Sequence, residues 1–181
     1  MFGNILVWLT HNYQIVVANG KVVDAPVLPG SISSNKIFNS DLLMNEGDIK
    51  QASKLLGNGK GKASGQVFLM TKGGEPRYAS GGHVSLYPVC DYIQRYHKEY
   101  AKSVLNFPEH DSAWFKFVRS TEADAQGNFQ FENLPNGQYY IESSVFWEVA
   151  GKSQGGIVRR MIIIDDSNLT IRVNLTGAHL I

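Results

Sequence analysis

Apolar and polar residues alternate one by one through much of the second half of the chain. Phe129 and Phe131 alternate with amide and acidic neighbours, and Tyr139 and Ile141 alternate with their neighbours in the next segment. Because successive side chains of a strand point to opposite faces, this pattern predicts strands with one apolar and one polar face. We therefore expect sheets that bury one face and leave the other in water.

Strand patterns of this kind recur between turn signals throughout the rest of the chain. Seven segments carry them, which predicts a mainly β protein built as a β-sandwich of seven strands. The Gly-rich segment 72–82 is predicted to be a loop between the first two strands. The seven segments are residues 64–71, 83–89, 113–124, 127–133, 137–149, 155–166 and 169–176.

One helical pattern interrupts these strands. Tyr92, Tyr96, Tyr100 and Val104 recur four positions apart, so they form one stripe along a helix whose charged residues fall largely elsewhere. Residues 91–113 are therefore predicted to be a helical insertion in the sandwich. The tyrosine stripe has two interpretations, because it can pack on the sandwich or present a surface for interaction with another molecule.

The first part of the chain predicts a β-hairpin. Asn19 and Gly20 stand between two Val-rich runs, and this pair suits the positive φ values of a tight two-residue turn. Pro26 and Pro29 then end the strand pairing, because proline cannot donate a backbone hydrogen bond. A lone hairpin is marginally stable in water, so it must pack on its own domain or on another subunit.

A helix is predicted next, over residues 40–56. Ser40 can cap its start, Gly57 can end it, and Gly47 is expected to divide it in two.

The Gly-rich stretch 57–65 is the best candidate for a domain boundary, since its composition is that of a flexible link. We therefore expect an N-terminal extension over residues 1–60, made of hairpin, helix and link. The sandwich domain, with its helical insertion, is expected over residues 61–181.

The bulk composition excludes some classes of function. The 181 residues carry a formal net charge of +1, whereas nucleic-acid binding normally shows as a basic surplus. The apolar run from Ile5 to Leu9 is too short to span a membrane and lacks the preceding positive charge of a signal peptide. The single cysteine, Cys90, cannot form an intrachain disulfide and is expected to be a buried structural thiol.

The stretch from Thr121 to Ile141 resembles a motif of the carboxypeptidase-regulatory-like, or transthyretin-like (prealbumin-like), β-sandwich domain. That motif places a threonine, turn residues, alternating aromatics and a Leu-Pro-x-Gly turn in fixed order. The matching positions are Thr121, Ala123, Asp124, Gly127, Phe129, Phe131, Leu134, Pro135, Gly137, Tyr139 and Ile141. The resemblance covers residues 62–177. It implies the fold and favours a cell-envelope or extracellular location, but it is poorly specific for function.

No pattern of catalytic, cofactor-binding or metal-ligating residues accompanies the resemblance. Transthyretin-like folds include hydroxyisourate hydrolases, but their C-terminal Tyr-Arg-Gly-Ser signature is missing here. None of the five histidines lies in a tight metal-ligand spacing. The sequence also contains no P-loop, nucleophile elbow or dinucleotide fingerprint. We therefore expect a protein that is not an enzyme and that needs no cofactor.

An intramolecular isopeptide bond is a further hypothesis, because related collagen-adhesin B-type sandwiches carry one. That chemistry joins a first-strand lysine to a last-strand asparagine beside a buried acid. Lys62, Asn174 and Glu142 are the only trio in suitable places. Glu142 alternates with Tyr139 and Ile141, however, and is therefore expected to face outward.

The function expected from the sequence is a structural or adhesion protein. The N-terminal hairpin, the tyrosine stripe and the last strand offer edges or faces to other subunits, in a homo-oligomer or a larger assembly. The alternative is a carbohydrate- or small-ligand-binding module. Trp147 and Trp114 are the candidate stacking residues of that alternative, although core packing is the commoner role of both.

Overall fold

The computed structural model describes residues 40–101 and 109–176 in full, and the backbone of three strands near the N-terminus. The chain divides into two compact units, Met1–Asn35 and Lys36–Ile181. The second unit thus starts well before residue 61, where the sequence placed the start of the sandwich domain. Its first helices belong with the sandwich because, as described below, they bond to residues of the insertion 91–113.

The first unit contains a three-stranded antiparallel sheet in the order β1-β2-β3. The strands are β1 (Leu6–Thr10), β2 (Tyr13–Ala18) and β3 (Lys21–Asp24). Ala18 pairs with Lys21, which confirms the predicted hairpin. The turn residues Asn19 and Gly20 themselves, like Pro26 and Pro29, lie outside the described residues.

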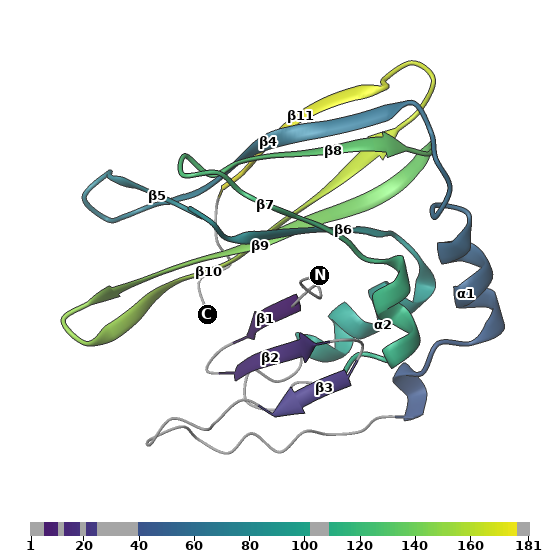
Figure 1. Ribbon diagram of the computed structural model, residues 1–181, viewed down its shortest axis with the longest axis horizontal. Helices are drawn as coiled ribbons and strands as arrows, with labels where there is room; N and C mark the ends of the chain where they lie inside the picture. The colour runs from purple at the N-terminus through teal and green to yellow at the C-terminus, as the bar shows by residue number, and fades with distance from the viewer. Residues whose placement is uncertain (1–5, 11–12, 19–20, 25–39, 102–108, 177–181) are drawn as a thin grey trace. The chain divides into compact units, whose positions relative to one another are not determined.

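Two sheets make up the larger unit (Figure 1). The first sheet is antiparallel, in the order β10-β9-β6-β7, and the second has β4 at its centre with β11 on one side and β8 and β5 on the other. β11 runs parallel to β4, whereas β5 and β8 run antiparallel to it. The strands are β4 (Gly61–Met70), β5 (Pro76–Tyr78), β6 (His83–Pro88), β7 (Arg119–Glu122), β8 (Asn128–Leu134), β9 (Gly137–Val149), β10 (Lys152–Ile164) and β11 (Thr170–Leu175).

The prediction of seven strands is wrong by one, because these two sheets contain eight. The additional strand is β5, which lies in the segment predicted to be a Gly-rich loop and pairs Tyr78 with Phe68. The predicted strand 113–124 is only partly a strand, since its first half is the 3-10 helix η2 (Ser112–Phe117). The carboxylate of Asp111 accepts a hydrogen bond from the Ala113 N–H and so fixes the start of this helix.

The main core lies between the two sheets. The alternation predicted from the sequence is confirmed, because Phe129, Phe131, Tyr139 and Ile141 are all buried there. The Tyr139 hydroxyl donates to the Pro135 carbonyl at 2.8 Å, so the buried ring keeps a polar partner. Gly65 lies where a Cβ atom would meet the Val173 carbonyl oxygen, so the close approach of β4 and β11 requires a residue without a side chain.

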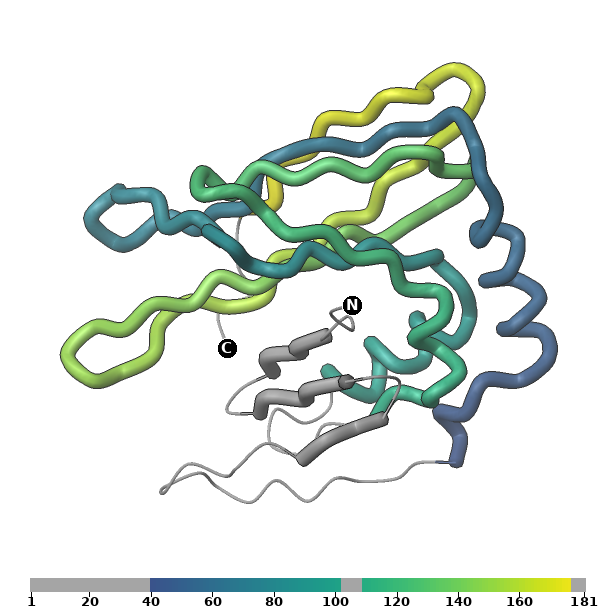
Figure 2. Tube along the Cα trace, viewed as in Figure 1, coloured from purple at the N-terminus to yellow at the C-terminus, as the bar shows by residue number. Residues whose placement is uncertain are grey.

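A second cluster of buried residues lies on the other face of the first sheet. It joins helices to strand residues such as Tyr87 of β6 and Tyr140 of β9. The backbone of these helices lies beside one end of the sheet (Figure 2). We call these helices the helical layer: η1 (Ser40–Leu42), α1 (Glu46–Ser53), α2 (Asp91–Tyr100) and η2. The helical layer thus covers the part of this face formed by β6 and β9, and β6 is buried along most of its length.

The predicted helix over residues 40–56 is corrected to a short 3-10 helix followed by α1. Asn45, not Ser40, caps α1, and its side chain accepts from the Asp48 N–H while Asp48 accepts from the Asn45 N–H. Gly47 lies inside α1 and does not divide it, and α1 ends at Ser53. The interruption falls before Asn45 because this reciprocal pair of bonds starts a new helix there.

Candidate functional site

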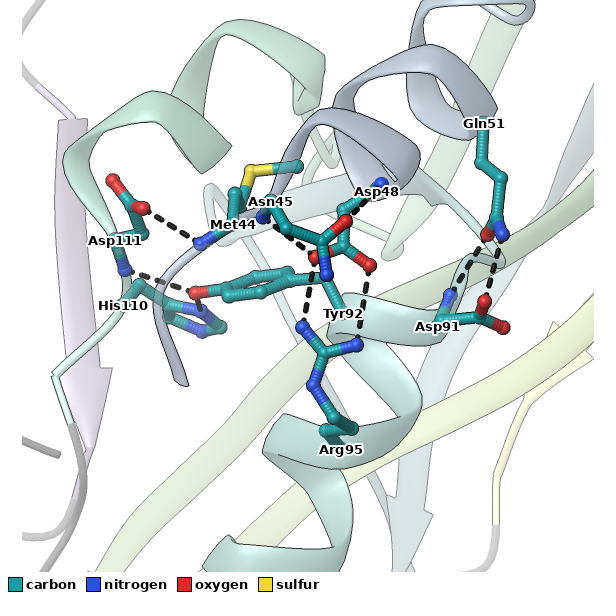
Figure 3. Close-up of polar contacts among 9 residues, drawn as sticks. All are labelled: Met44, Asn45, Asp48, Gln51, Asp91, Tyr92, Arg95, His110 and Asp111. Atoms are coloured by element: carbon teal, nitrogen blue, oxygen red, sulfur yellow. Dashed lines mark hydrogen bonds and ion pairs between the residues drawn. The ribbon is translucent and has the colours of Figure 1, made fainter. Parts of the chain in front are cut away.

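The helical layer is held together by an ion pair between α1 and α2 (Figure 3). The Arg95 guanidinium donates to both Asp48 carboxylate oxygens, at 3.2 and 2.8 Å, and the Asp48 side chain is only 2% exposed. Burial raises the pKa of Asp48, but the hydrogen bonds and charge of Arg95, together with the Asn45 N–H, outweigh it and leave the pKa below its usual value. Asp48 therefore stays charged inside the layer.

A second set of bonds is centred on Tyr92 (Figure 3). The Tyr92 hydroxyl accepts from the Asp111 N–H at 2.9 Å and lies 3.0 Å from His110 Nδ1. The Asp111 carboxylate in turn accepts from the Met44 N–H at 2.8 Å. These bonds connect α2 to the residues that precede η2 and to the residues between η1 and α1. This group of side chains therefore has a structural role.

The predicted tyrosine stripe turns its rings inward. Tyr92 and Tyr96 are buried in the helical layer, and Tyr100 is half-buried against the same cluster. Val104 and the end of the predicted helix lie outside the described residues. The packing interpretation therefore accounts for the described part of the stripe.

Two histidines lie among these rings. His110 stacks on Tyr96 with ring centroids 3.6 Å apart, and His97 packs edge-on against Tyr140 at 5.2 Å. Burial lowers the pKa of both imidazoles to about 3, helped for His97 by the nearby Arg159. Both are therefore neutral at ordinary pH, as packing in an aromatic cluster requires.

The isopeptide trio is not brought together. Lys62 forms an exposed ion pair with Glu132 at 2.8 Å, and it is paired in register with Thr170, four positions before Asn174 in β11. Glu142 belongs to the other sheet and faces away from the main core, as the alternation predicts, but the helical layer covers part of that face. It is half-buried because its carboxylate accepts from the Tyr87 hydroxyl and from Arg159, beside the helical layer.

The other residues singled out in the sequence lie in or against the interior. Cys90 is buried, as predicted, and burial raises the pKa of its thiol. Trp114 is buried in the helical layer. Trp147 is half-buried and packs against the main core, so its ring is only partly available to a ligand.

The outer face of the second sheet is different, because its side chains are exposed or half-exposed and almost all polar. Register places them in lateral rows across β11, β4 and β8. One row contains Asn174, Gln66 and Asn128, and the next contains Arg172, Ser64 and Gln130. We call this surface the amide face: Lys62, Ser64, Gln66, Phe68, Tyr78, Asn128, Gln130, Glu132, Arg172 and Asn174.

An aromatic pair stands at one end of the amide face. Tyr78 is 40% exposed, and its ring lies 6.1 Å from that of Phe68, its cross-strand neighbour. Sequence reasoning missed Tyr78 because segment 72–82 was predicted to be a loop. The available signal was the spacing of Pro76 and Tyr78, which matches the period of a strand.

Many donors of the amide face are held in place by neighbours. Gln66 Nε2 donates to the Gln126 carbonyl at 2.8 Å, and Gln130 Nε2 donates to Glu132 at 3.0 Å. Asn128 Nδ2 donates to the Asp124 carboxylate. Each of these bonds uses an amide nitrogen and orients the side chain in advance. No described residue donates a hydrogen bond to the three amide carbonyl oxygens, which can therefore act as acceptors.

The described part of the chain contains neither a candidate metal site nor a candidate membrane-spanning helix. No group of three or more His, Cys, Asp or Glu side chains within residues 40–101 and 109–176 could hold a metal ion. Among the helices described, none has the length and apolar character needed to cross a bilayer.

Comparison with known proteins gives a likeness at the level of structure. The chain is similar to a "putative carbohydrate binding protein" of Pseudomonas aeruginosa, with 25% identity and a TM-score of 0.63, over 74% of this chain and 99% of that one. It also aligns with BcpA, the major pilin subunit of Bacillus cereus, at 11% identity and a TM-score of 0.40, over 66% of this chain and 30% of that one. No family model and no curated protein matches the chain.

Proposed function

We propose that the chain is a non-enzymatic carbohydrate-binding module with a transthyretin-like sandwich, working at a cell surface or outside the cell. The observation that carries the proposal is the amide face with the exposed Tyr78 ring at its end. An aromatic ring can stack on the apolar face of a sugar, while amides offer both donors and acceptors to neighbouring hydroxyls. The likeness to the Pseudomonas aeruginosa protein supports the same class of ligand.

The first test is loss of the Tyr78 ring. Tyr78→Ala is expected to weaken binding to polysaccharides on an array about tenfold, because stacking contributes on the order of 1 kcal/mol. Tyr78→Phe keeps the ring and is expected to bind like the parent. Affinity electrophoresis against the polysaccharides that bind the parent measures the change.

A matched control is Met161→Ala. Met161 is 48% exposed and lies on β10, in the other sheet, so its loss removes exposed apolar surface without touching the amide face. If Met161→Ala and Tyr78→Ala weaken binding equally, the assignment to the amide face is wrong. If the parent binds no polysaccharide, the carbohydrate function is wrong.

The second candidate function is assembly with other copies of the chain. It is favoured by the N-terminal three-stranded sheet, which belongs to a compact unit of its own. A three-stranded sheet has two open edges and gains stability by pairing them or by burying an apolar face. We infer that, in this case, residues 1–35 would carry the contacts between subunits of a homo-oligomer.

Removal of residues 1–35 tests the assembly function. The shortened chain keeps η1 and α1, which the helical layer needs, and is expected to be monomeric where the full chain is oligomeric. Light scattering after size exclusion measures the mass, and thermal unfolding checks that the sandwich remains folded. Assembly through this unit is ruled out if both chains have the mass of a monomer.

A further inference from the structure

The rows of the amide face repeat regularly along β4. Lys62, Ser64, Gln66 and Phe68 alternate with buried residues, so successive rows lie about 6.6 Å apart and the four rows extend for about 20 Å. The face is three strands wide, which corresponds to about 10 Å from β11 to β8. This surface is therefore long and narrow, and one sugar ring on Tyr78 would cover only its first row.

The chemistry changes along this length from aromatic to amide to charged. The Tyr78 row comes first and the row of Gln66 follows it. The next row contains Arg172, whose side chain forms no ion pair or hydrogen bond with the described residues. Beyond it Lys62 and Glu132 neutralise one another at 2.8 Å. Groups able to bind hydroxyls are thus present at every row, with little net charge.

We propose that the amide face binds an internal stretch of an extended polysaccharide that lies along β4, with one sugar on Tyr78 and later sugars reaching Arg172. This inference rests on the proposed carbohydrate function and adds that the ligand is a chain, not a terminal sugar. A polymer chain is long enough to contact several of these rows at once, which a single sugar ring is not. Neighbouring rows then act as linked sites, each adding to the affinity.

The test measures affinity against ligand length. The full chain is titrated calorimetrically with cello-, xylo- and galacturonate oligosaccharides, each from disaccharide to hexasaccharide. In at least one series the affinity is expected to rise about tenfold from the shortest to the longest member, as further rows are engaged. Equal affinity at all lengths in every series that binds would overturn the inference and leave the carbohydrate function standing.

Arg172→Ala gives the second measurement. Arg172 is exposed and distant from Tyr78, so its loss is expected to weaken the hexasaccharide about fivefold and leave the disaccharide unchanged. Tyr78→Ala is expected to weaken both. If Arg172→Ala weakens the two ligands equally, or neither, the chain does not run along β4. Failure of every series to bind, together with no binding on the polysaccharide array, would instead overturn the proposed carbohydrate function itself.

Discussion

Replacing Asp48 with alanine is expected to lower the free energy of unfolding by about 3 kcal/mol. The substitution removes the partner of Arg95 and one half of the reciprocal bonds that start α1. Asp48 is almost fully buried, so water cannot replace those bonds without opening the layer. The large value comes from leaving polar groups unpaired in the interior, and not from the strength of the ion pair alone. Urea unfolding measures the change.

A control for this prediction is an arginine–carboxylate ion pair that is exposed on the surface of the protein. Glu75 lies 3.4 Å from Arg77, and both side chains are well exposed. Glu75→Ala is expected to change stability little, because exposed pairs contribute little. Asp48→Asn keeps the shape but loses the charge and should fall between the two. Equal losses for Asp48→Ala and Glu75→Ala would show that the helical layer does not depend on this contact.

Acidification from pH 7 to pH 5 is expected to lower the free energy of unfolding by up to about 2 kcal/mol for each of His97 and His110. Both have a folded-state pKa of about 3, far below the value near 6.5 of an unfolded imidazole. The stability that this difference provides is fully present above pH 6.5 and is lost as the pH falls toward 3. The lowered pKa of Asp48 adds a further loss below its ordinary value of 3.8.

Urea unfolding curves at pH 7, 6 and 5 measure this dependence. His97→Gln and His110→Gln are each expected to remove about half of the pH dependence in this range, and the double variant most of it. The variants also change packing, so the comparison is between slopes against pH and not between absolute stabilities. A slope that survives in the double variant would assign the acid sensitivity to other groups.

The parts of the fold predicted from the sequence are those decided by local alternation. Alternate side chains of a strand lie on one face, so a strand with apolar residues at every second position buries all of them together. This accounts for the burial of Phe129, Phe131, Tyr139 and Ile141. The segment 113–117 is rich in apolar residues but does not alternate strictly, and its buried residues Trp114 and Phe117 are three apart, which suits a 3-10 turn. The cap provided by Asp111 and the burial of Trp114 and Phe117 in the helical layer both favour the 3-10 helix.

The candidate site was less predictable because it depends on register. The polar residues of β4, β8 and β11 can be recognised as outward-facing one strand at a time. Their grouping into rows requires the parallel pairing of Gln66 with Asn174 and the antiparallel pairing with Asn128. Nothing local in the sequence encodes those partners. Glu142 lies on the face opposite Tyr139 and Ile141, as the alternation predicts, but the strand pattern does not reveal that a second layer covers part of that face.

The link between α1 and α2 has a consequence for the order of folding during synthesis. Asp48 and Arg95 are 47 residues apart in the chain. The end of α1 therefore leaves the ribosome long before its partner, and β4 and β6 emerge in between. We expect α1 to stay unpaired until α2 has been made. The nascent chain would then expose the apolar side of α1 to chaperones during this interval, and the helical layer would close late.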